Sequence, residues 1–179
     1  ITMRYDVSRN ETKLTNTYGL SKFLATKYLI SLFKKIKFPV TIIRLYQVYG
    51  THQDSNRLIP IVINNCLKNK IFPCSHGKQM RDFIYVDDVS KIIIRLIKSS
   101  QKGIINLASG RSYSFQQILD FLTRILNSDI RVKEFDRTKA KVDHHYSNKK
   151  LKNLASGFEF TSLKNGLEEM CQSLNAIRK

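Results

Sequence analysis

The spacing of apolar residues along the chain predicts six helices, in which one face is apolar and the other polar. In the first of them, apolar side chains recur every three or four residues from Leu20 to Leu32. The six predicted helices cover residues 18–35, 58–68, 87–98, 115–126, 149–154 and 162–177. Ser114 is placed to cap the fourth helix, and Asp87 or Asp88 to cap the third, because short oxygen-bearing side chains satisfy the free N–H groups of a first turn.

Runs of β-branched and apolar residues between the helices predict strands. The runs at 40–46 and 103–108 are continuously apolar, which is typical of parallel strands covered by helices on both faces. We expect these two strands to be buried neighbours in one sheet. Residues 83–86 predict a further short strand, and residues 130–135 alternate like a strand with one wet face. Helices that alternate with buried strands indicate an α/β fold.

The composition excludes several classes of protein but does not indicate a function. The chain has 179 residues, which corresponds to one domain or to one domain with part of a second. Hydrophobic residues make up 42%, while Gly and Pro number only 7 and 3, so the sequence is neither disordered nor collagen-like. We predict no membrane span and no signal peptide, because Lys and Arg interrupt every long apolar run.

The charge balance is strongly basic. Lys and Arg total 31 against 14 Asp and Glu, which gives a formal net charge of +17. The basic residues are spread along the chain, and this favours a basic surface or an anionic small ligand over a nucleic-acid-binding arm. A basic nucleic-acid module remains an alternative.

Cysteine and histidine show no spacing typical of a metal site. The three cysteines form no CxxC pair, and none of the four histidines has a second metal ligand four residues away. We therefore predict no metal and no disulfide framework, and a reducing cytoplasm fits this cysteine usage best.

One pair of residues has a spacing suited to proton transfer. Tyr18 and Lys22 are four residues apart in the first predicted helix, so they share one face. A nearby positive charge favours the phenolate form of a tyrosine, which can then exchange a proton with a sugar hydroxyl or carbonyl. The alternative is a tyrosine at the surface beside a solvated lysine.

Four motifs in a fixed order along the chain support a catalytic role for Tyr18 and Lys22. They are Tyr-Gly-Leu-Ser-Lys at 18–22, Ile-Arg-Leu-Tyr-Gln-Val-Tyr-Gly at 43–50, the segment 77–89 with Arg-Asp-Phe-Ile-Tyr-Val, and Ile-Asn-Leu-Ala-Ser-Gly at 105–110. This set resembles the C-terminal half of extended short-chain dehydrogenases/reductases, the family of nucleotide-sugar epimerases, dehydratases and ketoreductases. The stretch 56–81 is most similar to the 4-ketoreductases of deoxyhexose synthesis, such as CDP-abequose synthase.

The resemblance implies roles for residues around the reacting sugar. Tyr18 would be the acid/base, and Lys22 would bind the cofactor ribose. Tyr46, Gln47 and Val48 would lie beside the nicotinamide and the sugar of an NAD- or NADP-dependent enzyme. Gln47 stands where the family usually has Asn, and ordinary packing at the end of a strand is the alternative for Tyr46 and Val48.

A second set of residues would bind the nucleotide. The resemblance implies that Arg81 binds the diphosphate, a group that suits the guanidinium fork; a salt bridge to Asp82 or Asp87 is the alternative. Arg137 resembles the family's second phosphate arginine, although Arg-Thr-Lys-Ala replaces the usual Arg-Pro-Gly-Asp. Residues expected to line the base are Asn56, Leu58, Phe72 and Pro73, and core packing is the alternative for Leu58 and Phe72.

The resemblance also implies a domain arrangement. We expect residues 1–55 and 84–128 to form the C-terminal part of a Rossmann-like NAD(P)-binding domain, and 56–83 with 129–179 to form a small α/β nucleotide-sugar-binding subdomain. The sequence holds no Gly-x-x-Gly-x-x-Gly turn and no Ser or Thr about two dozen residues before Tyr18, so we expect both in a preceding part of a longer enzyme.

The functional expectation is an NAD(P)-dependent nucleotide-sugar epimerase, dehydratase or ketoreductase. The resemblance further implies deoxysugar, lipopolysaccharide or other surface-polysaccharide biosynthesis, and a homodimer formed through the helix at 18–35. A non-catalytic relative that binds a dinucleotide or a protein is the alternative.

Overall fold

The computed structural model describes residues 4–6, 11–13, 17–75, 77–128, 131–136, 141 and 143–176. The chain divides into two compact units. The first comprises residues 1–42 with 101–104, and the second comprises residues 43–100 with 105–179.

The first unit contains a long helix and a short hairpin. Helix α1, Thr17–Ile36, confirms the helix predicted from the apolar spacing. Lys37 follows it with φ of 55°, the left-handed conformation that commonly ends a helix. Strands β1, Arg4–Asp6, and β2, Glu11–Lys13, pair antiparallel. The sequence pattern does not predict these two strands, because three residues are too few to show an alternating pattern.

Strands β3, Thr41–Leu45, and β7, Gly103–Leu107, are neighbours in one sheet, as expected. The backbone N–H of Gly103 donates to the carbonyl of Val40 at 2.9 Å. The expectation of a fully buried first strand was wrong. β3 is half-buried, Leu45 at its end is 52% exposed, and the strand stops one residue before Tyr46.

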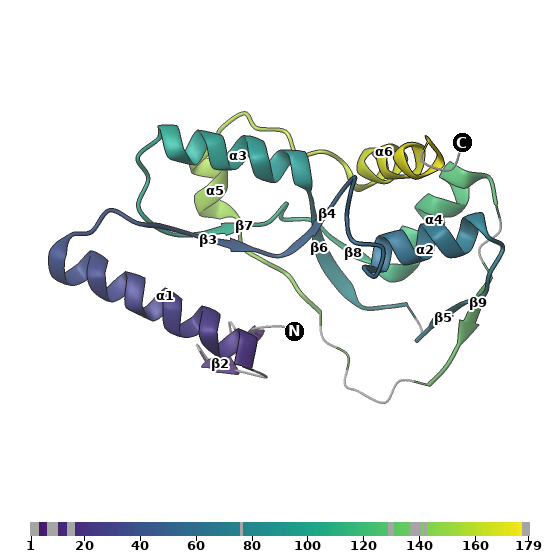
Figure 1. Ribbon diagram of the computed structural model, residues 1–179, viewed down its shortest axis with the longest axis horizontal. Coiled ribbons are helices and arrows are strands. Elements are labelled where there is room, and N and C mark those ends of the chain that lie inside the picture. Colours follow the sequence, from purple (N-terminus) through teal and green to yellow (C-terminus); the bar gives the residue numbers. More distant parts are fainter. Residues whose placement is uncertain are drawn as a thin grey trace. The chain divides into compact units, whose positions relative to one another are not determined.

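The second unit is organised around a three-stranded sheet (Figure 1). Strand β6, Met80–Tyr85, lies in its centre, with β4, Gln47–Tyr49, parallel on one side and β8, Ser112–Ser114, antiparallel on the other. A smaller parallel pair joins β5, Phe72–Cys74, to β9, Val132–Glu134. This pair brings together parts of the two segments assigned to the predicted substrate subdomain, and that subdomain stays a prediction.

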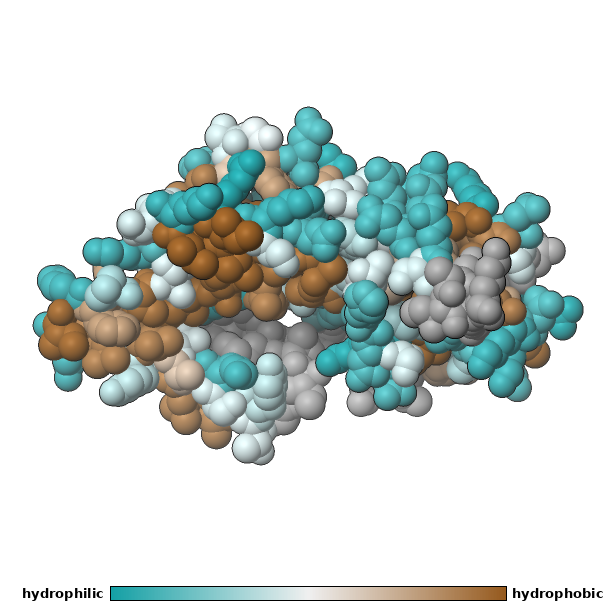
Figure 2. Space-filling view, turned by 45° about the horizontal axis from the view of Figure 1, so that its top comes forward, coloured by the Kyte–Doolittle hydropathy of each residue, from teal (hydrophilic) through white to brown (hydrophobic). Residues whose placement is uncertain are grey.

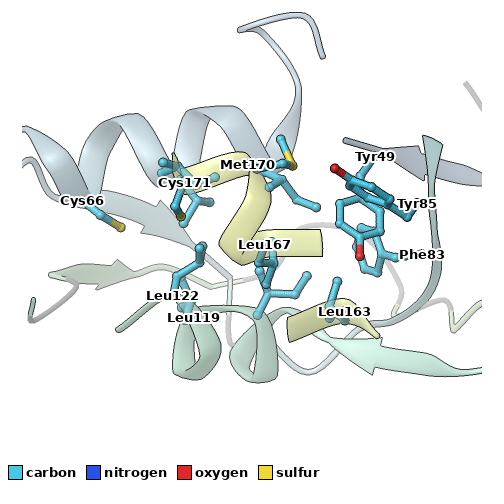
Figure 3. Packing of buried hydrophobic residues seen from close by; sticks show 14 residues of the cluster. Tyr49, Cys66, Phe83, Tyr85, Leu119, Leu122, Leu163, Leu167, Met170 and Cys171 are labelled. Carbon is cyan, nitrogen blue, oxygen red and sulfur yellow. The ribbon is translucent and has the colours of Figure 1, made fainter. Parts of the chain in front are cut away.

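Alternation along β6 gives the second unit its two layers of core. Phe83 and Tyr85 belong to one hydrophobic cluster, and Ile84, between them, belongs to another. The first cluster is completed by α2, Leu58–Leu67, α4, Phe115–Leu126, and α6, Leu163–Ala176 (Figure 3). The second cluster is completed by α3, Val86–Lys98, β7 and α5, Lys149–Leu154. Helices therefore cover both faces of this strand, and the α/β class is confirmed.

Two predicted helix caps had different outcomes. Ser114 caps α4 as predicted, and Gln117 completes a reciprocal capping box with it. The prediction for Asp87 or Asp88 was wrong, because α3 begins at Val86 and both aspartates lie in its first turn. Asp88 is buried, and its carboxylate accepts hydrogen bonds from the backbone N–H of Thr161 at 2.7 Å and from its hydroxyl at 3.0 Å. Asp88 therefore ties α3 to the chain that leads into α6.

The surface mixes polar and apolar side chains (Figure 2). Ile94 and Ile97 of α3 are 54% and 75% exposed. In the part of the chain that the structure describes, no helix is both long and apolar enough to cross a bilayer. Within the same ranges, no cluster of three or more His, Cys, Asp or Glu side chains could hold a metal ion.

Candidate functional site

The predicted proton-transfer pair lies on one face of α1. The ammonium nitrogen of Lys22 stands 5.4 Å from the centroid of the Tyr18 ring. Tyr18 is 59% exposed, so its phenol is open to a ligand. The same helix places the ammonium of Lys27 5.4 Å from the ring of Phe23. The spacing alone therefore does not identify a reactive pair, and only Tyr18 adds a hydroxyl that can move a proton.

The three residues predicted beside the nicotinamide lie where the chain changes strand partners. Tyr46 separates β3, which pairs with β7, from β4, which pairs with β6. The backbone N–H of Val48 donates to the carbonyl of Tyr46 at 3.0 Å, which tightens this junction. Gln47 is exposed, whereas Val48 packs against the second cluster. Val48 thus has the packing that the alternative describes, Gln47 is open to a ligand, and the contacts of both with a nicotinamide or a sugar stay predictions.

Arg81 lies half-buried on β6. Its guanidinium donates to the carbonyl of Met80 at 2.8 Å and to the side-chain oxygen of Gln79. The neighbouring Asp82 is fully buried and serves the turn at Ser109 and Gly110. Its carboxylate accepts from the Ser109 N–H at 2.9 Å, the Ser109 hydroxyl at 2.8 Å and the Gly110 N–H at 2.8 Å.

Burial raises the pKa of the Asp82 carboxyl, and the hydrogen bonds from Ser109 and Gly110 oppose that shift. Asn148 holds the same turn through its own amide, which donates to the carbonyls of Ala108 at 3.2 Å and Ser109 at 2.8 Å. Asp82 and Asn148 together clamp the Ser-Gly turn that the sequence analysis recognised only as part of a motif.

The residues predicted to line the base lie on two elements. Asn56 and Leu58 are exposed at the start of α2, and Leu58 is 42% exposed. Pro73 is exposed on β5, whereas Phe72 packs against the first cluster, with its ring centroid 5.4 Å from that of Phe115. Phe72 thus has the packing that the alternative describes and Leu58 does not, and the base contacts of both residues stay predictions.

The predicted phosphate contact at Arg137 lies outside the described residues.

One aromatic contact is not predicted by the sequence. The rings of Tyr46 and Tyr146 are stacked, with centroids 3.4 Å apart and planes inclined by 22°. Burial raises the pKa of Tyr46, and it raises the pKa of Tyr146 to about 12, while the positive charge of Arg81 acts in the opposite direction on Tyr146. Tyr146 lies in a polar stretch with no periodic pattern, so no feature of the sequence pointed to it.

A family model for the NAD-dependent epimerase/dehydratase family matches residues 4–108, which is more than half of the chain. The chain belongs to this family. The match includes Tyr18, Lys22, the strand junction at Tyr46 and Arg81.

Solved structures of the epimerase/dehydratase class share the fold. A UDP-N-acetylglucosamine 4-epimerase from Methanobrevibacter ruminantium M1, in complex with UDP-N-acetylmuramic acid, superposes with a TM-score of 0.85 at 24% identity, over 98% of this chain and 59% of that one. A UDP-glucuronic acid 4-epimerase from Bacillus cereus, in complex with UDP-glucuronic acid and NAD, gives 0.82 at 21% identity, over 93% of this chain and 55% of that one. A dTDP-glucose 4,6-dehydratase from Bacillus anthracis str. Ames, in complex with NAD, gives a TM-score of 0.83 at 19% identity, over 94% of this chain and 55% of that one. The present chain thus spans less than two thirds of the length of these proteins.

Proposed function

We propose that the full-length protein is an NAD-dependent enzyme that oxidises or reduces a nucleotide sugar at one ring carbon, with Tyr18 as its acid/base. The observation that carries this proposal is the pairing of an exposed phenol with an ammonium group 5.4 Å from its ring, within the segment that matches the epimerase/dehydratase family. The match at 4–108 supports the cofactor class, and the choice between NAD and NADP is part of the test.

The residues of α1 fit the reacting end of a nicotinamide dinucleotide. Lys22 is exposed and would donate to the ribose hydroxyls. Tyr18 would take the proton from a sugar hydroxyl during oxidation and return it during reduction. The bound nicotinamide supplies the hydride acceptor or donor for that carbon.

The second unit would bind the nucleotide part of the substrate. We propose that Arg81 binds the diphosphate, that exposed Asn56, Leu58 and Pro73 contact the base, and that Gln47 contacts the sugar. Leu58 and Pro73 are apolar and exposed, as a surface that stacks against a base must be. The proposal extends to deoxysugar or surface-polysaccharide synthesis. A 4-keto sugar is common to the three reaction types, as an intermediate of C4 epimerisation, the product of 4,6-dehydration and the substrate of 4-ketoreduction.

A substrate panel separates those three reaction types. Full-length protein is incubated with NAD or NADP and with UDP-N-acetylglucosamine, UDP-glucuronic acid or dTDP-glucose, and the products are resolved by NMR. A C4 epimer without net reduction of the cofactor identifies an epimerase, and loss of water to a 4-keto-6-deoxy sugar identifies a dehydratase. In a separate incubation with NADH or NADPH and a nucleotide 4-keto sugar in place of those substrates, oxidation of the cofactor identifies a ketoreductase. Absence of all three activities, and of nucleoside diphosphate binding, would reject the proposal.

Arg81→Lys tests the diphosphate contact. Lysine keeps the charge but loses the two-pronged geometry, so KM for the nucleotide sugar should rise more than kcat falls. Arg95→Lys is the matched control, because Arg95 lies over the ring of Phe158, 5.1 Å from its centroid, on α3. An unchanged KM in Arg81→Lys would remove Arg81 from the substrate site.

We also propose that the protein is a homodimer that pairs α1 with its twin. Leu24 and Tyr28 of this helix are 55% and 65% exposed. A Leu24→Glu variant should then give a monomeric mass by light scattering, whereas wild-type protein gives twice that mass. A monomeric wild type would reject the dimer.

A further inference from the structure

The stacked pair Tyr46–Tyr146 joins two segments that the sequence separates widely. With ring centroids 3.4 Å apart and planes 22° from parallel, the two phenols share a large apolar contact. Contacts between aromatic rings stabilise a fold beyond the apolar area that they bury. The contact is therefore strong enough to influence where the Tyr46 ring lies.

Tyr146 is held on a segment that is fixed on both sides of it. On one side, the His144 N–H donates to the carbonyl of Met80 at 3.0 Å, and the Ser112 hydroxyl donates to the carbonyl of His144 at 3.1 Å. On the other side, the Asn106 amide donates to the carbonyl of Ser147 at 3.2 Å. These bonds attach residues 143–148, hereafter the strap, to β6, β7 and β8.

The strap is hydrogen-bonded to β6 at Met80, the residue immediately before Arg81. Besides accepting at its carbonyl, Met80 donates its N–H to the carboxylate of Asp143 at 2.9 Å. Both backbone groups of Met80 therefore bind the strap. The segment that carries Tyr146 is thus tied to the residue beside the proposed diphosphate ligand.

Tyr46 lies at a position where the strand ladder is interrupted. β3 ends at Leu45 and β4 begins at Gln47, and the two strands pair with different neighbours. A fixed ring against its side chain restrains this junction, and with it the exposed Gln47.

We propose that Tyr146 is a positioning residue. Its ring, held by the strap, fixes the positions of Tyr46 and Gln47 relative to Arg81. The sugar and the diphosphate of one substrate can then bind Gln47 and Arg81 at the same time. This inference rests on the proposed function. It assigns to the polar segment 143–148 a role in substrate binding that its own sequence pattern did not indicate.

The test compares Tyr146→Leu with Tyr146→Phe in the full-length protein. Leucine removes the stacked ring, and phenylalanine keeps it. We expect Tyr146→Leu to weaken UDP binding, measured by calorimetry, and to raise the nucleotide-sugar KM by about 3- to 10-fold, with a smaller change in kcat. Tyr146→Phe should stay within about twofold of wild type. Equal losses in both variants, or none in the folded Tyr146→Leu variant, would overturn the inference.

A second measurement does not depend on activity. Stacking shifts the ring resonances of Tyr46 upfield, and Tyr46→Phe assigns them. We expect this shift to vanish in Tyr146→Leu, to persist in Tyr146→Phe, and to change for both tyrosines of the wild type when UDP is added. If Tyr146→Leu does not fold, the wild-type protein still provides a test. Ring resonances of Tyr146 whose chemical shifts do not change when UDP binds would overturn the inference. A wild type that binds no UDP, dTDP or CDP instead rejects the proposed function itself, and the inference with it.

Discussion

The ammonium of Lys22 lies 5.4 Å from the centre of the Tyr18 ring, one helical turn along α1. One turn further, Lys27 lies at the same distance from Phe23. The helix thus carries two similar cation–aromatic pairs, and only one of them includes a hydroxyl. The second pair supplies matched controls for the first.

Tyr18→Phe should lower kcat of the full-length enzyme by roughly 10²–10⁴-fold, the usual contribution of a general acid/base. The ring stays in place and is 59% exposed, so the thermal midpoint should not change. Tyr28→Phe, at a tyrosine that is 65% exposed on the same helix, removes a hydroxyl with no proposed role in proton transfer and should leave kcat unchanged. Steady-state kinetics measure kcat, and calorimetry measures the thermal midpoint of Tyr18→Phe. Full activity in Tyr18→Phe would exclude Tyr18 as the acid/base.

Lys22→Met should weaken binding of the nicotinamide cofactor by about 10- to 100-fold, because a hydrogen bond from a charged donor is lost. Lys27→Met removes the same charge one turn away and should bind the cofactor like wild type. Cofactor titration of the full-length protein measures both affinities. Equal losses in the two variants would point to net charge rather than to a specific contact.

Asp82→Asn should destabilise the fold by about 1–3 kcal/mol, because an amide presents a donor where the carboxylate now accepts from Ser109 and Gly110. Asp120→Asn is the control, since Asp120 is exposed and accepts only a 3.2 Å side-chain bond from Gln116 among the contacts described. Urea unfolding gives the free energies. Equal free energies of unfolding in Asp82→Asn and Asp120→Asn would show that the bonds from Asp82 to the Ser109–Gly110 turn do not stabilise the fold.

Gly166→Ala should also destabilise the protein, because the added Cβ would overlap the hydroxyl of Tyr49 and lie 2.9 Å from its ring. Among the residues that the structure describes, that buried hydroxyl has no hydrogen-bond partner. Tyr49→Phe should therefore be neutral or stabilising, and it should recover part of the loss in the double variant. If the changes in unfolding free energy caused by Gly166→Ala and Tyr49→Phe simply add in the double variant, the predicted overlap is contradicted.

Alkaline pH should reveal the burial of Tyr146. Its pKa is raised from 10.0 to about 12 in the folded protein, so its stabilising contribution is complete below pH 10 and is lost as pH rises through 12. The stability of wild type relative to Tyr146→Phe should therefore be constant below pH 10 and fall between pH 10 and 12. Chemical unfolding at a series of pH values measures this difference. Parallel curves for the two proteins would contradict the raised pKa.

The sequence by itself determined the elements whose causes are local. The helices α1 and α4 follow from apolar spacing, and the capping box of Ser114 and Gln117 involves residues only three positions apart. The Tyr18–Lys22 contact is of the same kind, because one helical turn brings such a pair together in any fold. Four motifs in order were also enough to indicate the family.

Only the tertiary structure decided where the chain changes strand partners and what supports that junction. The run of apolar and β-branched residues at 40–46 predicts one strand, whereas in the structure β3 ends at Leu45 and pairs with β7, and a separate strand, β4, begins at Gln47 and pairs with β6. Asp82 looked like a partner for Arg81, but it binds the turn at Ser109 instead. The stack of Tyr46 on Tyr146 likewise joins residues from distant segments. Such contacts follow no period along the chain, because they depend on which strands pair and on what those pairings bring together.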